Sequence, residues 1–383
     1  MRQSEVKGLP KILGPVTSDD FFRQYWELQP LHISRNDNEY FADVLTLAQI
    51  ETLLSTQELR FPSVQLSHRK NPIASAEYTD ASDQILPLRL IEYHHEGATI
   101  VISQAHKRLS ALAQLKRQIQ QELQLRCQTN LYLSPPENQG FNAHYDSHDV
   151  FILQVQGSKT FNFYGGGVEL PYNHEAFEPG RHVPGALEES ITVEPGDTLY
   201  IPRGVMHDAV ANDTTSLHIT LGVYAMTQRD VLLEMVEVLT DQDTSYRQSI
   251  LPRLQSETDS LLDLQFTPLQ LQNAIGRLID DVAVSGMQDC SGRLMALESG
   301  TTLSLDSTIG IRDQQILQTE RQGNTLSCRS AGVVLEFTDP MGRAIEQMQS
   351  TTSLPLRQLQ WLSDEQKIAL CVRLQQANLI TVL

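Results

Sequence analysis

The sequence predicts a mainly antiparallel β-barrel, with helices before it, a helical region after it and a small α/β unit at the end of the chain. Three observations support this expectation. From Asn130 to Tyr224, short apolar segments alternate with Pro and Gly turns, which is the pattern of antiparallel strands. Helical spacing of apolar residues dominates on both sides of that stretch. With 383 residues the chain is also long for one domain and suits two or three.

The first predicted region, residues 1–226, starts with helices and continues into the barrel. Helical signals occur at Ser18–Phe22 and at Leu45–Leu54. A longer amphipathic helix follows, because apolar residues recur there near the 3.6-residue period, at Leu109, Leu112, Leu115, Ile119 and Leu123. The barrel strands then run to residue 226.

The second region, residues 227–300, is predicted to be helical. Its two clearest segments are Val231–Leu239 and Leu269–Ile279. Both are too apolar to face water on all sides, so they need a partner. That partner is either the core of the same subunit or a second copy of the chain.

The third region, residues 301–383, is predicted to be a small α/β unit. A hairpin is expected around Gln322–Asn324, followed by a strand at Val333–Leu335 and a β-prone end at Leu379–Leu383. A helix should begin at Ser363, whose spacing to Gln366 makes a capping box. The region holds eight acidic and seven basic residues, so it lacks the basic stripe of a DNA-binding module.

Composition narrows the function classes. A net charge of −18 argues against a general nucleic-acid binder, because the phosphate backbone rewards cationic surfaces. An acidic protein can instead attract a basic polypeptide. The four cysteines form no pair motif, and no apolar run reaches the length of a membrane span. We therefore expect a cytoplasmic enzyme without a membrane partner.

Three residues form the candidate metal site: His144, Asp146 and His207. His144 and Asp146 precede the β-prone segment Phe151–Gln156, and side chains two apart on a strand leave from the same face. His207 follows a strand and the tight turn Pro202–Gly204, so it can arrive from a neighbouring strand. Two imidazoles and one carboxylate are the ligand set of non-haem Fe(II) oxygenases. Zinc accepts the same ligand types, and among 11 histidines the pattern could also arise by chance.

Lys159 is the second informative residue. It lies just past Gly157 at the start of an aromatic segment, where burying a cation is costly without an anionic partner. One interpretation is an outward-facing lysine on an edge strand, and the other is a charge partner for a dicarboxylate. Two further histidines stay open. His148 is expected beside the site or at the surface, whereas His218 is either a support for the site or a core histidine.

At this point the sequence resembles the JmjC-type, cupin-fold oxygenases, and among them the ribosomal oxygenases. The resemblance spans nearly the whole chain, from Phe21–Ile33 onwards. It is most specific in Asn130–Asp146, and it continues through Gly157–Lys159 and Leu199–Gly204.

The resemblance implies a double-stranded β-helix with Fe(II) held by His144, Asp146 and His207. It implies 2-oxoglutarate as cosubstrate, bound by Lys159 and lined by Asn130 and Tyr132, together with dioxygen. It also implies a homodimer through residues 227–300 and a winged-helix-like domain at 301–383, for which no direct DNA binding is expected. The implied reaction is hydroxylation of a side-chain carbon, with Arg or His of a ribosomal protein as the first candidates.

Two other functions remain open from the sequence. The same chemistry could act on a natural-product peptide or a small molecule. Alternatively, the barrel could be a non-catalytic cupin that binds a partner, although a pure binder has no need for both the three metal ligands and Lys159.

Overall fold

The computed structural model describes residues 7–247, 266–284, 303–311, 318–330, 333–351, 353–377 and 379–382. The chain forms two compact units, Met1–Met226 and Thr227–Leu383. Within the described residues, no helix has the length and apolar character needed to cross a bilayer.

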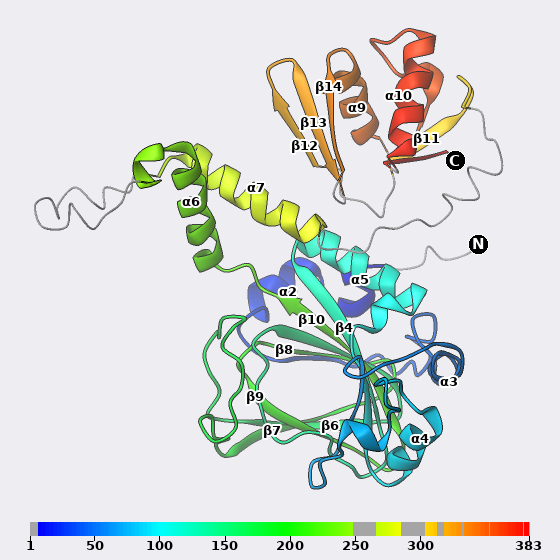
Figure 1. The fold of residues 1–383 in the computed structure, drawn as a ribbon, viewed down its shortest axis with the longest axis vertical. Coiled ribbons are helices and arrows are strands. Elements are labelled where there is room, and N and C mark those ends of the chain that lie inside the picture. Colours follow the sequence, from blue (N-terminus) through cyan, green and yellow to red (C-terminus); the bar gives the residue numbers. More distant parts are fainter. Residues whose placement is uncertain are drawn as a thin grey trace, which may run out of the picture. The chain divides into compact units, whose positions relative to one another are not determined.

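The first unit is built on two antiparallel sheets (Figure 1). The larger sheet has seven strands in the order β1-β8-β5-β10-β4-β3-β2, and the smaller has three in the order β7-β6-β9. The strands of the larger sheet are β1 (Leu31–Ile33), β2 (Val64–Ser67), β3 (Thr99–Ile102), β4 (Arg126–Ser134), β5 (Asp149–Gln156), β8 (Thr198–Ile201) and β10 (Ser216–Tyr224). Those of the smaller sheet are β6 (Lys159–Tyr164), β7 (Leu187–Val193) and β9 (Met206–Ala211). The predicted antiparallel strands between Asn130 and Tyr224 are therefore present.

Alternating burial shows which side chains point inward. In β6, Lys159, Phe161 and Phe163 are buried and the residues between them are half-buried, as expected for a strand with one face on a core. Lys159 thus shares a face with two phenylalanines and is not an outward-facing edge lysine. In the larger sheet β10 lies between β4 and β5 and pairs with both along most of its length. This pairing sets Tyr132 of β4 directly opposite His218 of β10.

The helices of the first unit precede β4 in the sequence and pack against the larger sheet in the main core. They are α1 (Leu9–Leu13), α2 (Ser18–Gln24), α3 (Leu47–Thr56), α4 (Pro87–His95) and α5 (Ser110–Leu123), with the 3₁₀ turns η1 (Ser75–Glu77) and η2 (Ala105–Lys107). The three predicted helices are confirmed as α2, α3 and α5. Thr46 and Gln49 form a capping box that starts α3, and α5 buries Leu112 and Ile119 in the main core.

A buried ion pair ties the N-terminal segment to the barrel. Asp149, at the start of β5, is fully buried and accepts hydrogen bonds from the Tyr200 hydroxyl at 2.6 Å and from Arg203 Nη1 at 2.9 Å. The same Arg203 nitrogen also pairs with Glu27, which follows α2. Breaking one partner of such a pair leaves a buried charge uncompensated, at a cost of about 3–5 kcal/mol. Glu27 therefore helps to hold Arg203 in place. Arg203 belongs to the turn Pro202–Gly204, which leads to the candidate metal ligand His207.

The second unit begins with a helical pair, α6 (Gln228–Gln242) and α7 (Pro268–Val284), with the short turn η3 (Thr244–Arg247) between them. Both predicted helices are confirmed, and each is longer than its apolar segment suggested. They share a small core of Met235, Val238 and Ala274. The parts of the predicted helical region at 248–265 and 285–300 lie outside the described residues.

In the described part of the remaining second unit, two three-stranded sheets and two helices surround a core of their own. One sheet has the order β15-β11-β16 and the other β12-β13-β14. The elements are β11 (Thr308–Ile311), β12 (Gln318–Gln322), β13 (Thr325–Ser330), β14 (Val333–Thr338), α9 (Met341–Gln349), β15 (Leu354–Pro355), η5 (Leu356–Gln358), α10 (Asp364–Gln376) and β16 (Ile380–Val382). The hairpin at Gln322–Asn324 is confirmed, and so is the capping box of Ser363 and Gln366 at the start of α10.

Candidate metal centre and anion pocket

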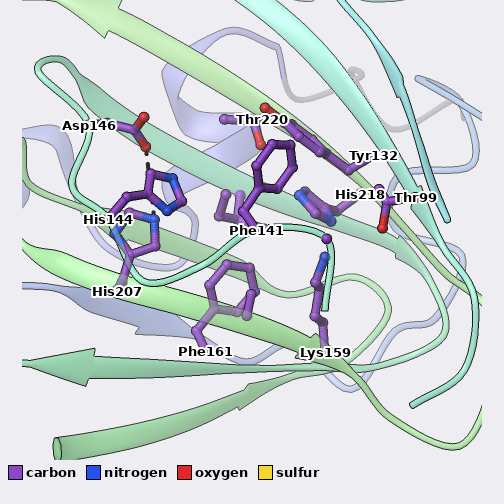
Figure 2. A pocket seen from close by; sticks show the side chains of 13 residues that line it. Thr99, Tyr132, Phe141, His144, Asp146, Lys159, Phe161, His207, His218 and Thr220 are labelled. Carbon is purple, nitrogen blue, oxygen red and sulfur yellow. Dashed lines mark ion pairs between the residues drawn. The ribbon is translucent and has the colours of Figure 1, made fainter. Parts of the chain in front are cut away.

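The three predicted metal ligands converge in the first unit. One ligand atom from each of His144, Asp146 and His207 lies within 4.8 Å of the other two. His207 Nε2 lies 3.9 Å from an Asp146 carboxylate oxygen (Figure 2). His144 and Asp146 are half-buried, whereas His207 is buried. No other group of three potential ligands occurs among the described residues.

Backbone pairing brings the two histidines together from distant parts of the chain. His144 and His207 form an isolated antiparallel bridge, with N–O distances of 2.9 and 2.7 Å in the two directions. Their imidazole rings are 4.9 Å apart between centroids. The bridge therefore holds the two backbones side by side, so that both imidazoles start from neighbouring positions.

Each histidine also has one ring nitrogen occupied by a backbone carbonyl. His144 Nδ1 lies 2.9 Å from the carbonyl of Asn142, and His207 Nδ1 lies 2.9 Å from that of Val205. A carbonyl only accepts, so Nδ1 carries the proton in both rings and Nε2 keeps its lone pair. This arrangement orients metal-binding histidines in known sites. The donor set therefore fits a divalent transition metal.

The turn before His207 is fastened to the segment that carries Asp146. Gly204 has φ of 84°, and its N–H donates to the Asp146 carbonyl at 2.8 Å. A Cβ at this position would lie 1.8 Å from the Val168 carbonyl oxygen. Only glycine fits this backbone without a shift, so Gly204 helps to place Asp146 and His207 on the same side of the site.

A cavity of about 100 Å³ extends from the metal ligands into the space between the two sheets. Its lining residues come from both sheets and from the loop before His144, and Figure 2 shows their side chains. They are Thr99, Tyr132, Gly140, Phe141, His144, Asp146, Ile152, Lys159, Phe161, His207, Ala209, His218 and Thr220. The cavity thus joins the predicted metal ligands to two of the three predicted cosubstrate residues, Lys159 and Tyr132.

Lys159 lies at the end of the cavity away from the metal ligands (Figure 2). Its side chain is 4 % exposed, and Nζ donates to the Ser134 hydroxyl at 3.1 Å. Within residues 7–247 no carboxylate pairs with this ammonium group, and burial lowers the pKa of Lys159 to about 8. A buried cation without an anionic partner costs free energy. A bound anion that reached Nζ would remove that cost.

His218 is a pocket residue whose role the sequence left undecided. It is 4 % exposed and stacks on Tyr132, with ring centroids 5.0 Å apart and planes at 9°. Burial, and then the charge of Lys159, hold the pKa of His218 well below its ordinary value. Its Nδ1 is buried and lacks a hydrogen-bond partner among the described residues. A neutral imidazole with a free polar atom beside Lys159 can bind a polar group of a ligand.

Two residues considered from the sequence lie outside the cavity lining. Asn130 shares the strand of Tyr132, but its amide oxygen accepts the backbone N–H of Gln104 at 3.0 Å. Asn130 also makes a side-chain hydrogen bond to Tyr132, so its contribution to the cavity is indirect. Burial has the largest effect on the Tyr132 hydroxyl and raises its pKa to about 12. His148 stacks on Tyr224 at 4.8 Å and 10° and does not reach the cavity.

The sequence reasoning did not identify several lining residues, above all Thr99, Phe141 and Thr220. Thr99 belongs to β3 and donates to the Ser134 hydroxyl at 3.0 Å, so it supports the serine that accepts from Lys159. Thr220 lies two residues after His218 on β10, where strand alternation gives both side chains the same face. That alternation could have identified Thr220, whereas nothing local in the sequence connects Thr99 to the site.

Comparison with known proteins identifies the domain. Residues 102–231 match the JmjC domain family. Curated relatives include the bifunctional lysine-specific demethylase and histidyl-hydroxylase NO66 of Drosophila willistoni, 31 % identical over 230 residues, which are 58 % of this chain and 29 % of that protein. NO66 of Culex quinquefasciatus is 29 % identical over 229 residues, 58 % of this chain and 35 % of that protein. The chain thus spans about a third of the length of these relatives.

Solved structures give a match over almost the whole chain. A structure of YcfD, a ribosomal oxygenase from Escherichia coli, in complex with cobalt and 2-oxoglutarate aligns with a TM-score of 0.53. The alignment covers 96 % of this chain and 98 % of YcfD at 16 % sequence identity. At that identity the likeness concerns the fold. The expected JmjC barrel is therefore confirmed by the domain match and by the fold.

Proposed function

We propose that this chain, whose residues 102–231 match the JmjC domain family, is an Fe(II)- and 2-oxoglutarate-dependent dioxygenase that hydroxylates a side-chain carbon of a protein. The observation that carries the proposal is the pairing of two features in one cavity. Three convergent ligands lie at one end, and a buried lysine that pairs with no carboxylate of residues 7–247 lies at the other. This pairing fits a ligand that touches a metal with one end and carries an anion at its other end.

The ligand roles follow from the donor atoms. His144 and His207 would give their Nε2 atoms to Fe(II), and Asp146 would give a carboxylate oxygen. Two imidazoles and one carboxylate are the donor set of non-haem iron enzymes, and these three groups would hold the ion next to the cavity, where a cosubstrate could reach it. Together, bound iron and 2-oxoglutarate supply the oxidising chemistry that inserts one oxygen atom from dioxygen into a C–H bond.

The protein groups would bind and orient the cosubstrate. Lys159 Nζ pairs with the distal carboxylate of 2-oxoglutarate, which adds a charge-assisted hydrogen bond to the one it makes with Ser134. Tyr132 donates its hydroxyl to the cosubstrate, and the neutral His218, beside Lys159, offers Nδ1. Ile152 and Phe161 line the walls between the two ends, where apolar groups exclude water and strengthen the ionic contact.

The substrate is proposed from the relatives and from the charge of the chain. NO66 is described as a histidyl-hydroxylase and YcfD as a ribosomal oxygenase. Ribosomal proteins are basic, and this chain carries a net charge of −18, which favours encounter with a cationic polypeptide. An arginine or histidine side chain of a ribosomal protein in the cytoplasm is therefore our first candidate.

A direct experiment tests the reaction. Ribosomal proteins from cells with the wild-type chain and from cells with His144→Ala would be compared by mass spectrometry. We expect one peptide that is heavier by an oxygen atom only in the wild-type sample. Metal analysis of the purified protein tests iron against zinc, which accepts the same donors. Turnover of 2-oxoglutarate only with a small molecule, or no turnover with any iron-loaded sample, would support the alternative functions.

We also propose that the chain is a homodimer through the helical pair. Beyond the small core that α6 and α7 share, several large apolar side chains are exposed on both helices. They are Leu232, Leu233, Val236, Leu269, Leu271 and Ile275. A surface of this kind on a soluble protein marks an interaction site, and a two-fold pairing would bury both copies at once.

Sedimentation or light scattering tests the dimer. The wild-type chain should have twice the mass of one subunit, and Leu233→Glu should yield monomers. Glu237→Lys, on the same helix, is the control and should stay dimeric. We further propose that residues 301–383 form a winged-helix-like domain that contacts protein and not DNA. In a gel-shift assay at low salt, the protein should therefore not retard a DNA probe.

A further inference from the structure

Phe141 is the most unusual side chain at the cavity because it lines the cavity and is also 42 % exposed. A phenylalanine that only packed in a core would be buried. Its ring centroid lies 6.1 Å from that of His144 and 5.9 Å from that of Tyr132, with a T-shaped arrangement to the tyrosine. His144 is a candidate metal ligand, whereas Tyr132 stacks on His218. The ring therefore lies between the metal ligands and the Tyr132–His218 pair (Figure 2).

The loop that carries Phe141 packs closely against Thr99 of β3, which lines the cavity. A Cβ on Gly140 would lie 2.8 Å from the Thr99 hydroxyl, so the absence of a side chain lets the loop approach β3 closely. The Gly140 carbonyl accepts from the Ser67 hydroxyl at 2.6 Å. These contacts set the start of the loop, and the bridge at His144 sets its end.

Arg69 fastens the same loop on both sides of Phe141. Its Nε donates to the Asn142 side-chain oxygen at 2.8 Å, and its Nη1 donates to that of Gln139. Asn142 in turn gives its backbone carbonyl to His144 Nδ1. One exposed arginine thus bonds to two side chains of the loop, and one of these residues also orients a metal ligand.

From this geometry we propose that Phe141 is a roof over the cosubstrate chamber and that Arg69 is the positioning residue that holds the roof in place. The inference rests on the proposed function. The inner face of the ring covers bound 2-oxoglutarate, and its exposed face contacts the target side chain. Excluding water from this chamber strengthens the contact between Lys159 and the distal carboxylate. It also limits oxidation of the cosubstrate in the absence of a target.

The first experiment measures cosubstrate binding without turnover. Protein loaded with Mn(II) in place of Fe(II) is titrated with 2-oxoglutarate, and the relaxation rate of water protons reports both affinity and access of water to the metal. Phe141→Ala should weaken 2-oxoglutarate by about tenfold, as expected for the loss of one apolar face, and should raise the relaxation rate of the saturated complex. Phe141→Leu should keep most of the affinity, and it serves as the second variant if the alanine variant unfolds.

Phe22→Ala is the matched control. Phe22 is 41 % exposed on α2 and does not line the cavity, so its loss should leave both quantities unchanged. With the iron-loaded enzyme, Phe141→Ala should also raise the amount of succinate formed per hydroxylated product, whereas Phe22→Ala should not.

The second experiment tests whether Arg69 acts through Phe141. Arg69→Ala should weaken 2-oxoglutarate in the wild-type background and have little further effect in Phe141→Ala, because the roof is already gone. Arg89→Ala removes another exposed arginine, on α4, and should have no effect in either background. Additive effects of Arg69→Ala and Phe141→Ala would overturn the role given to Arg69.

The two proposals fail in different ways. If wild-type protein does not bind 2-oxoglutarate at all, the proposed function is wrong. If wild-type protein binds it and Phe141→Ala matches wild type in affinity, water access and coupling, the proposed function survives and the roof is wrong.

Discussion

The two ends of the cavity differ in how far water reaches them. At the metal end His144 and Asp146 are half-buried, and the loop above them is exposed at Phe141. At the other end Lys159 and His218 are each 4 % exposed. The difference indicates a division of tasks. Under the proposed function the open end would admit a target side chain. The closed end would hold the anion in a low-dielectric setting, which makes an ionic contact strong.

Removing a metal ligand should have the largest effect of any single change. His144→Ala leaves two protein ligands, so we expect no measurable turnover of 2-oxoglutarate and a strong loss of metal affinity, while the thermal unfolding temperature changes little. Turnover assays and metal titration check this. His148→Ala is the matched control, since that ring stacks on Tyr224 outside the cavity. Retained turnover in His144→Ala would remove the metal end from the mechanism.

The closed end should respond to the loss of its charge. Lys159→Ala removes a desolvated ionic contact worth about 2–5 kcal/mol, which corresponds to a roughly 30-fold to several-thousand-fold higher 2-oxoglutarate requirement. The rate at saturating cosubstrate should fall much less. Lys107→Ala, at an exposed lysine in η2, is the control. An unchanged requirement in Lys159→Ala would show that the anion binds elsewhere.

A smaller effect is expected from Tyr132→Phe, which keeps the ring on His218 and removes only the hydroxyl. Losing one hydrogen bond costs about 1–3 kcal/mol, or roughly 5-fold to 150-fold in cosubstrate affinity. Calorimetric titration of 2-oxoglutarate checks the value. If the loss matches that of Lys159→Ala, the closed end depends on the tyrosine as much as on the lysine, contrary to the division described above.

The pH dependence of 2-oxoglutarate binding tests the closed end without a mutation. Burial lowers the pKa of Lys159 from 10.5 to about 8, so above that pH the empty protein holds a neutral amine. Binding an anion then requires uptake of a proton, and affinity should fall by up to about tenfold per pH unit above 8. Over the same interval the unfolded chain binds more protons than the folded one, so this group makes the empty protein more stable as pH rises. Titrations in buffers of different ionisation enthalpy measure the proton uptake, and Lys159→Arg should abolish it.

The sequence predicted the open end better than the closed end for a physical reason. His144 and Asp146 lie two residues apart in the chain. His207 follows a turn that Pro202 and Gly204 mark in the sequence. The closed end is assembled from strands that become neighbours only through pairing. Thr99, Ser134 and His218 therefore had no local pattern to mark them, apart from the alternation along β10.

Asn130 shows where strand alternation gives an incomplete answer. Asn130 lies two residues before Tyr132 on β4, so alternation gives both side chains the same face. The backbone N–H of Gln104, however, donates to its amide oxygen. Which residues on one face reach a cavity depends on what covers each of them, and that is set by tertiary packing. For the helices, periodicity and capping residues were enough, as α3, α5 and α10 show.

The pairing of Arg203 with Glu27 limits how modular the barrel domain can be. The matched JmjC domain covers residues 102–231, yet Glu27 and strand β1, which pairs with β8, lie far outside it. A fragment cut at the domain limits would expose an edge strand and leave Arg203 without one of its two carboxylates. Grafting or swapping this domain between relatives should therefore carry the N-terminal segment along, because that segment completes the folding unit that aims the metal ligands.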